Sequence, residues 1–138
     1  MADAKPPMTV SLTWDGNLEF TGQAGKHEIG IDGATYTAAS PMQYLALSVA
    51  GCMAIDLVHI LTRGRHALTS LGAVFTGERA ADEPKRFTAI TLHFTLATDA
   101  APAVVERAIQ LSREKYCSAW NSLRQDISLN ATYEIGLR

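Results

Sequence analysis

The sequence predicts an α+β fold in which a mostly antiparallel sheet is covered by two long helices. Segments of alternating apolar and polar residues come in adjacent pairs separated by turn residues, which is typical of β-hairpins. Two other segments, 41–63 and 102–116, carry apolar residues at helical spacing. Because the strands pair with their neighbours in sequence instead of alternating singly with helices, an α+β arrangement is favoured over a parallel α/β one.

Length and composition set limits on the class of protein. The chain has 138 residues, of which 47% are hydrophobic and 19% charged, so we expect one domain over residues 1–138 with an ordinary core. The formal net charge is -2 and the isoelectric point is near 6.0. This lacks the basic surface of a nucleic-acid or anionic-membrane binder, so neither partner is expected.

Three strands are expected before the first helix. Residues 8–14 and 18–21 alternate in polarity on either side of Asp15 and Gly16, a pair typical of a hairpin turn. A third strand is expected over residues 27–32, within a glycine-rich stretch.

A helix over residues 41–63 is expected from its start signal. Ser40 can serve as the N-cap, Pro41 occupies a position where its missing N–H is harmless, and Gln43 stands where a capping box places Glu or Gln. Gly64 is the expected first residue after the helix. Asp56 and His59 argue against a membrane span. Since the helix is apolar on nearly all sides, it needs cover on two faces, and a partner subunit is the simplest second cover, so we expect a homodimer.

The second half of the chain repeats the strand and helix patterns. Period-two alternation predicts strands over 70–79 and 87–98, joined by a turn at 81–85. The helix from residue 102 to about 116 follows, then a short helix that Ser118 would cap and that runs to Arg124. A terminal strand is expected over residues 127–135.

Cysteine usage and the N-terminal residues bear on location and chemistry. The first seven residues contain one basic residue and no apolar run, so we expect no secretion signal and a cytoplasmic location. The chain has two cysteines, Cys52 and Cys117, too few for a disulfide scaffold or a four-thiolate zinc module. Composition alone favours inert core residues for both, although the predicted helix start after Cys117 could favour a thiolate.

Several ordered segments together carry a resemblance to a known family. They are the Ser-Pro-Met-Gln start nine residues before Cys52, Thr-Gly-Glu-Arg at 76–79, Leu-His-Phe at 92–94, and Ser-Arg-Glu-Lys-Tyr-Cys-Ser at 112–118. This set, spanning about residues 9–135, resembles the osmotically inducible protein C and organic hydroperoxide resistance (OsmC/Ohr) family, in an OsmC-like branch distinct from the well-studied hydroperoxidases.

The resemblance implies a function and an assembly. Cys52 would be the peroxidatic thiol and Cys117 the resolving thiol of a peroxide reductase, which needs no cofactor. The oxidised form would be an intrasubunit disulfide that a cellular dithiol reduces. The substrate would be a small organic hydroperoxide, and the fold an interlocked homodimer with its active sites at the subunit interface.

The sequence also departs from the family. The hydroperoxidases activate the thiolate with an N-terminal arginine that a glutamate orients, whereas this chain has no arginine before Arg63 and has Gln43 near the position of the glutamate. Slow reaction with peroxide at neutral pH is therefore expected. Lys26, His27 and His59 are the candidates for the missing cation.

Other interpretations stay open at the level of the sequence. His59 lies two turns after Cys52, so direct contact would need both side chains to lean together, and Asp56 would pair with an arginine or cap a backbone group across the dimer. No spacing of Cys, His and Asp matches a zinc site, so no metal is expected. The alternative function is a non-catalytic dimer of the same fold that binds a small hydrophobic molecule at the subunit interface.

Overall fold

A computed structural model describes residues 4–136 of the chain. The order of elements is the expected one, with a π-helical turn added after the second helix. The chain divides into two compact units, residues 1–45 and 46–138. The single domain expected from the sequence stays a prediction.

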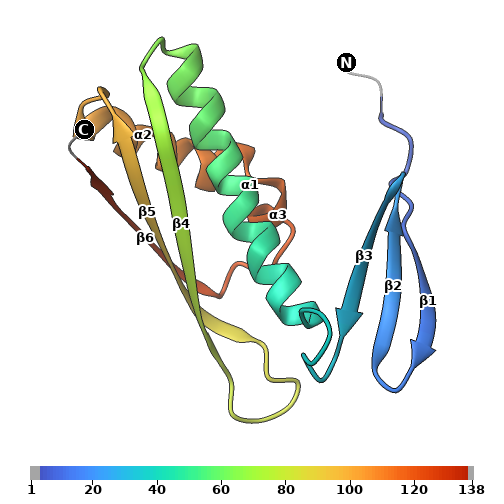
Figure 1. Cartoon of the computed structure of the whole chain (residues 1–138). Helices are drawn as coiled ribbons and strands as arrows, with labels where there is room; N and C mark the ends of the chain where they lie inside the picture. Colours follow the sequence, from blue (N-terminus) through green and yellow to red (C-terminus); the bar gives the residue numbers. More distant parts are fainter. Residues whose placement is uncertain (1–3, 137–138) are drawn as a thin grey trace. The chain divides into compact units, whose positions relative to one another are not determined.

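The first unit contains an antiparallel sheet of three strands with β2 in the middle (Figure 1). The strands are β1 (Ser11–Gly16), β2 (Glu19–Ala24) and β3 (His27–Asp32). The predicted hairpin between β1 and β2 forms, but its turn lies at Asn17 and Leu18 and not at Asp15 and Gly16. Gly16 is the last residue of β1, at a register shift, and has a φ of 109°, while Asn17 has a φ of 49°.

Asp32 organises the loop that leads from β3 to the first helix. Its side chain is 2% exposed, and its carboxylate accepts hydrogen bonds from the backbone N–H groups of Ala34, Tyr36 and Thr37 at 2.8, 2.9 and 3.0 Å. The N–H groups of Thr37 and Ala34 contribute most to lowering the pKa of Asp32. The loop backbone thus supplies the partners that a buried carboxylate requires.

Helix α1 (Pro41–Arg63) has the predicted bounds and the predicted start. The backbone N–H of Gln43 donates to Ser40 Oγ at 3.2 Å, and the N–H of Ser40 donates to Gln43 Oε1 at 2.9 Å, which completes a capping box.

Helix α1 ends at Arg63 as predicted, but Gly64 is not the left-handed residue of its C-terminal cap. The left-handed residue after the helix is Arg65, with a φ of 63°, and not Gly64. The N–H groups of Arg65 and His66 donate to the carbonyls of Thr62 and Leu61, both at 3.0 Å, as in a Schellman motif. Gly64 is needed for space instead, because a Cβ there would lie 3.0 Å from the His66 ring.

The second unit contains a mixed sheet of three strands in the order β4-β5-β6. Strands β4 (Leu68–Arg79) and β5 (Phe87–Thr98) pair antiparallel, and β6 (Ser128–Ile135) pairs parallel to β5. The expectation of mostly antiparallel pairing holds for every strand pair except this one. Its parallel direction arises because the chain crosses over through a helix between β5 and β6.

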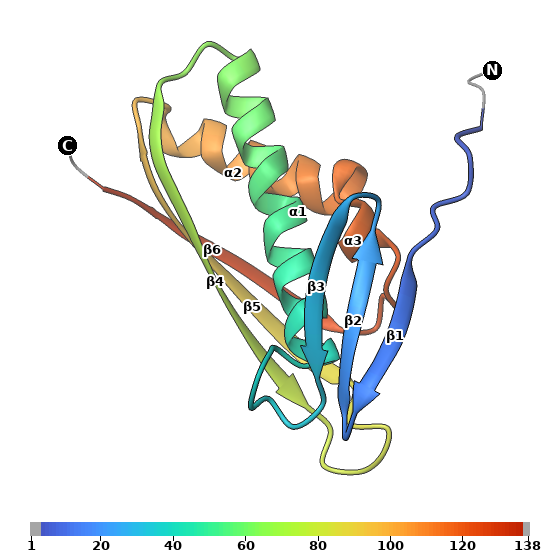
Figure 2. The same ribbon diagram turned by 45° about the vertical axis from the view of Figure 1, so that its right-hand side comes forward.

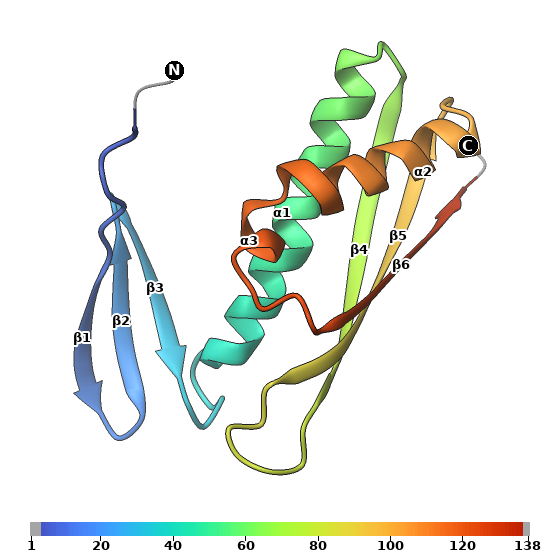
Figure 3. The same cartoon turned by 180° about the vertical axis from the view of Figure 1, so that it is seen from behind.

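Helix α2 (Pro102–Leu111) continues into the π-helical turn Ser112–Tyr116, and the short helix α3 (Ser118–Asn121) follows. Figures 2 and 3 show α2 crossing α1 on the same face of the sheet. The prediction that Ser118 caps α3 was wrong: Cys117 is the N-cap, and its Sγ accepts a hydrogen bond from the N–H of Trp120 at 3.3 Å. The helix also ends at Asn121, before the predicted Arg124.

The core of the second unit lies between the β4-β5-β6 sheet and the helices that cover one of its faces. From β5 it takes Ile90, Leu92, Phe94 and Leu96, all at most 2% exposed. From α1 it takes one face, formed by Val49, Met53, Leu57 and Leu61.

Another stripe of α1 stays exposed. Leu47, Ile55 and Val58 are exposed by 63%, 59% and 40%. By length and composition α1 could also cross a membrane, with a mean hydropathy of 1.9 over its most apolar 18 residues, a test that core helices pass as well. This exposed stripe is the face of α1 for which the sequence predicts a second cover.

Gly77 of β4 lies against two aromatic rings. A Cβ at this position would lie 2.6 Å from the ring of Phe87 and 2.8 Å from that of Phe75, and the two rings pack edge to face with centroids 5.4 Å apart. We predict that Gly77→Ala lowers the free energy of unfolding by about 1–3 kcal/mol, because the rings must shift to admit the methyl group. Denaturant unfolding measures this change.

Gly72 on the same strand is the matched control. A Cβ there would meet nothing within 4 Å, so Gly72→Ala should leave the stability unchanged or slightly higher. Equal effects of the two substitutions would contradict a steric role for Gly77.

Candidate functional site

The two cysteines, far apart in the sequence, come together where α1 meets residues 102–121, which comprise α2, the π-helical turn and α3 and are called the C-terminal helical segment below. Cys52 lies in the middle of α1 and is half-buried, whereas Cys117 follows the π-helical turn and is fully buried, and both are free thiols. The two thiols interact, because Cys52 contributes to raising the pKa of Cys117.

Local structure explains how Cys117 is held. The N–H of Cys117 donates to the carbonyl of Ser112 at 2.7 Å, a bond across five residues that closes the π-helical turn. Its carbonyl accepts from the N–H of Asn121 at 3.0 Å, and its Sγ accepts from the N–H of Trp120. Backbone bonds on both sides thus hold the Cys117 sulfur at the start of α3.

The surroundings of Cys117 disfavour its ionisation. Burial raises the pKa of the Cys117 thiol to about 11, and the neighbouring Cys52 and the negative charge of Asp56 act in the same direction. The N–H of Trp120 opposes them by donating to the sulfur. At neutral pH Cys117 is therefore a protonated thiol.

A polar pair lies beside the thiols in the contact between the two helices. Ser112 Oγ donates a hydrogen bond to Asp56 Oδ2 at 2.7 Å. Ser112 is 0% exposed, and Asp56 is half-buried one helical turn after Cys52. Within the described residues the hydrogen-bond partner of Asp56 is thus the Ser112 hydroxyl and not an arginine. The expected contact with a backbone group across the dimer stays a prediction.

Asp56 also borders a cavity of about 460 Å³. The cavity is lined from α1 by His59, Ile60 and Arg63, and from the C-terminal helical segment by Leu111 and Tyr116. Lys115 Nζ lies 5.3 Å from the centre of the Tyr116 ring. The cavity thus combines apolar walls with the Asp56 carboxylate, the His59 imidazole and the Arg63 guanidinium.

The structure places the four auxiliary candidates in different parts of the chain. His59 is exposed in this cavity, on the same helix as Cys52. Lys26 and His27 are exposed at the turn between β2 and β3, in the first unit. Gln43 also belongs to the first unit, where its amide oxygen completes the capping box. A role at the thiols stays a prediction for all four.

Sequence reasoning missed Ser112, although the sequence holds a signal for it. The buried positions Val105, Ala108 and Ile109 of α2 define a stripe at helical spacing, and Ser112 continues it at the next position. A polar residue on an apolar stripe must find a hydrogen-bonding partner when it is buried. Asp56 is a half-buried carboxylate on a mostly apolar helix, so it also needs a hydrogen-bonding partner.

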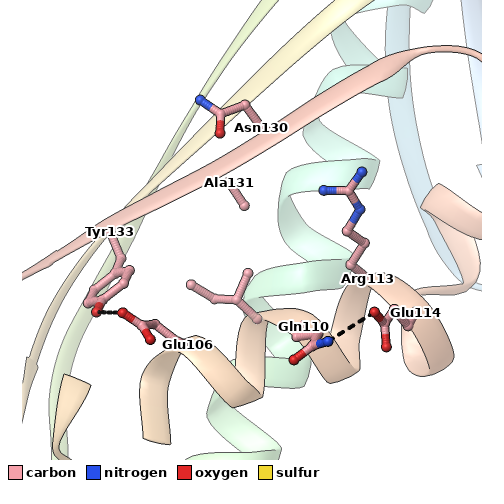
Figure 4. Close-up of a pocket in the computed structure, with 8 residues that line it drawn as sticks. Glu106, Gln110, Arg113, Glu114, Asn130, Ala131 and Tyr133 are labelled. Carbon is pink, nitrogen blue, oxygen red and sulfur yellow. Dashed lines mark hydrogen bonds between the residues drawn. The ribbon is translucent and has the colours of Figure 1, made fainter. Parts of the chain in front are cut away.

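A second cavity lies between α2 and β6, away from the thiols (Figure 4). Its volume is about 350 Å³, and it is lined by Glu106, Gln110, Arg113, Asn130 and Tyr133 among others. Tyr133 Oη donates to Glu106 Oε1 at 2.6 Å, and this bond raises the pKa of Tyr133. None of the candidate residues predicted from the sequence lies there. Among residues 4–136, no three His, Cys, Asp or Glu side chains could share a metal ion.

Comparison with known proteins identifies the family. The family model described as OsmC-like protein matches residues 32–132, which include both cysteines. The chain belongs to the OsmC-like protein family. It is also 37% identical to Protein YhfA of Escherichia coli K12 over 131 residues, covering 93% of this chain and 98% of the relative.

Solved structures share the same fold. A hypothetical protein from Aquifex aeolicus is 23% identical, with a TM-score of 0.89 over 97% of this chain and 99% of that one. An organic hydroperoxide resistance protein OsmC from Legionella pneumophila is 15% identical, with a TM-score of 0.71 over 96% and 100%. These matches confirm the α+β fold. Family membership supports a peroxide-related redox role for this OsmC-like chain.

The high pKa of Cys117 leads to a prediction for the Cys52→Ser variant, in which Cys117 is the only thiol. Thiolate ultraviolet absorbance should develop at a pH well above the free-thiol value of about 8.5, because burial is the largest cause of the shift and persists in the variant. The same variant unfolded in denaturant is the control and should titrate near that free value. Equal titration midpoints for the folded and the unfolded variant would contradict the burial of Cys117 as the cause of its raised pKa.

Proposed function

We propose that this OsmC-like protein is a thiol-dependent reductase of small organic hydroperoxides, with Cys52 as the peroxidatic and Cys117 as the resolving residue. The observation that carries the proposal is the pair of interacting free thiols that differ in exposure. The half-buried sulfur is the one that a peroxide can approach, and the buried sulfur is held beside it.

The chemistry takes two steps. The Cys52 thiolate attacks one peroxide oxygen and breaks the O–O bond, which gives a sulfenic acid and an alcohol once the alkoxide takes up a proton. Cys117 then attacks the Cys52 sulfur, water leaves, and an intrasubunit disulfide forms. A dithiol reductant, such as a cell supplies in its cytoplasm, restores both thiols by exchange. No step needs a cofactor or a metal.

The protonated state of Cys117 supports this division of roles. A neutral thiol can donate its hydrogen to the neighbouring sulfur, and a hydrogen bond to a thiolate favours the thiolate. The charge that acts on Cys117 is the negative one of Asp56, and the chain has no arginine before Arg63, unlike the better-known branch of the family. We therefore expect slow turnover at neutral pH.

We also propose that the functional form is a homodimer. The exposed stripe of α1 is one reason, since it includes Leu47 and Ile55. The first unit supplies another, because Leu12, Trp14 and Ile29, on one face of its small sheet, are exposed by 61%, 65% and 46%. Large exposed apolar surfaces of this kind mark interfaces between proteins, and a second copy of the chain carries matching surfaces.

The redox cycle predicts the outcome of a titration. One equivalent of cumene hydroperoxide added to the reduced protein should remove both thiols and lower the chain mass by about 2 Da, the mass of the two hydrogens lost on disulfide formation. Thiol counting and intact mass spectrometry measure this. Cys52→Ser should abolish peroxide consumption, and Cys117→Ser should leave a sulfenic acid at Cys52 that dimedone traps. Unchanged thiols in the wild type would contradict the peroxidase and favour the ligand-binding alternative.

The proposed dimer predicts the molecular mass in solution and a substitution that dissociates the dimer. Light scattering of dilute protein should give twice the chain mass of 14.9 kDa. Ile55→Lys should shift the protein towards monomer, because it places a charge on the apolar stripe of α1, whereas Ala103→Lys on the exposed side of α2 should not. A wild-type protein that stays monomeric at micromolar concentration would contradict the proposal.

A further inference from the structure

The Asp56–Ser112 pair is polar, yet it lies in an otherwise apolar contact between α1 and the C-terminal helical segment. Burying these groups costs free energy that their mutual hydrogen bond of 2.7 Å only partly regains, so an apolar pair of similar size would serve packing at least as well. The proposed peroxidase cycle leaves the pair without a role, although it adjoins both thiols.

The pair is tied to each cysteine by backbone geometry. Asp56 follows Cys52 by four residues on α1, so their Cβ atoms lie about 5–6 Å apart on one face of the helix. On the other side, the carbonyl of Ser112 accepts the N–H of Cys117 at 2.7 Å. Ser112 thus links Asp56 to the residue that carries the second sulfur, and the Asp56 charge is close enough to act on the Cys117 thiol.

The resolving step has a chemical requirement that this location can meet. The nucleophile in disulfide formation is a thiolate, whereas Cys117 is a thiol whose pKa is raised to about 11. At neutral pH only about one molecule in ten thousand would carry the thiolate at such a value. A nearby base that takes the proton during the attack would remove this limitation.

We propose that Asp56, oriented by Ser112, accepts the proton of the Cys117 thiol while Cys117 attacks the oxidised Cys52. The S–H bond of Cys117 breaks, the Cys52–Cys117 bond forms, and the leaving group departs from the Cys52 sulfur with its electron pair. When the leaving group is the hydroxide of a sulfenic acid, Asp56 passes the proton on and water leaves. The proposal rests on the proposed thiol cycle for its biological purpose.

The titratable and charged groups around Asp56 come from the cavity that it borders. The cavity that it borders also exposes His59 and Arg63 of α1 and Tyr116 of the π-helical turn, with Lys115 against the tyrosine ring. The buried side chains of β5 and β6 beneath the helices are apolar and bring no further titratable group. Asp56 is thus the carboxylate that can act on Cys117 from within this contact.

The experiment uses 5,5′-dithiobis(2-nitrobenzoate) in place of a peroxide, so it does not depend on peroxidase activity. The Cys52 thiolate attacks the reagent and releases one thionitrobenzoate. Cys117 then attacks the resulting mixed disulfide at the Cys52 sulfur and releases the second. The rate of the second release measures the step assigned to Asp56. The Cys117→Ser variant identifies this release, because it cannot carry out the second attack.

The proposal predicts both a variant effect and a pH profile. Asp56→Asn retains an oxygen for the Ser112 hydroxyl but cannot take a proton, so at pH 7 the second release should slow by about 10²-fold while the first release stays within about twofold. In the wild type the second release should change little between pH 6 and 8. A tenfold rise per pH unit would overturn the proposal without any variant, since it indicates attack by Cys117 already ionised.

Ser112→Ala separates chemistry from positioning. It removes the hydrogen bond and keeps the carboxylate, so the second release should slow less than in Asp56→Asn and keep the flat pH profile. Equal slowing in both variants at every pH would show a merely structural role and overturn the proposal. So would a faster second release in Asp56→Asn, because it would mean that the charge only suppresses the Cys117 thiolate. Failure of the peroxide titration alone would overturn the proposed function and leave this result intact.

Discussion

The contact between α1 and the C-terminal helical segment is the constraint on which the site depends. Cys52 comes from the middle of one helix and Cys117 from the junction after the other, so the relative placement of the helices decides whether the thiols meet. The apolar face of α1, which includes Met53 and Leu57, packs against the sheet, and so does the apolar stripe of α2. This packing fixes the point along their lengths at which the two helices cross. The Asp56–Ser112 hydrogen bond then sets the register of the contact at one point.

The same contact explains why the two cysteines differ. Both are thiols in mostly apolar helical surroundings, but only Cys117 ends a π-helical turn that carries it fully into the core. Burial and a neighbouring carboxylate keep it protonated, while Cys52 on the longer helix stays half-buried. Two residues of one type thereby acquire the different properties that a two-thiol redox cycle requires.

Local signals account for what could be predicted of the fold. The capping box at Ser40 and Gln43 involves residues three apart, and both of its bonds form as expected. The strand 27–32 and the helix 41–63 have the predicted bounds because polarity alternation and capping act over a few residues. The errors at Gly64 and Ser118 lie at helix ends, where the geometry depends on which neighbour can adopt a left-handed angle or turn its side chain to the backbone.

The sequence by itself determined the order of elements, the family through its ordered segments, and the two cysteines as candidates. Tertiary structure decided what those cysteines can do. The partners in the Asp56–Ser112 bond are separated by 56 residues, a separation at which neither periodicity nor spacing carries information. The parallel pairing of β5 with β6 follows from the helical crossover that connects them. The burial of Cys117 likewise depends on the packing of apolar faces from the whole chain and not on any one segment.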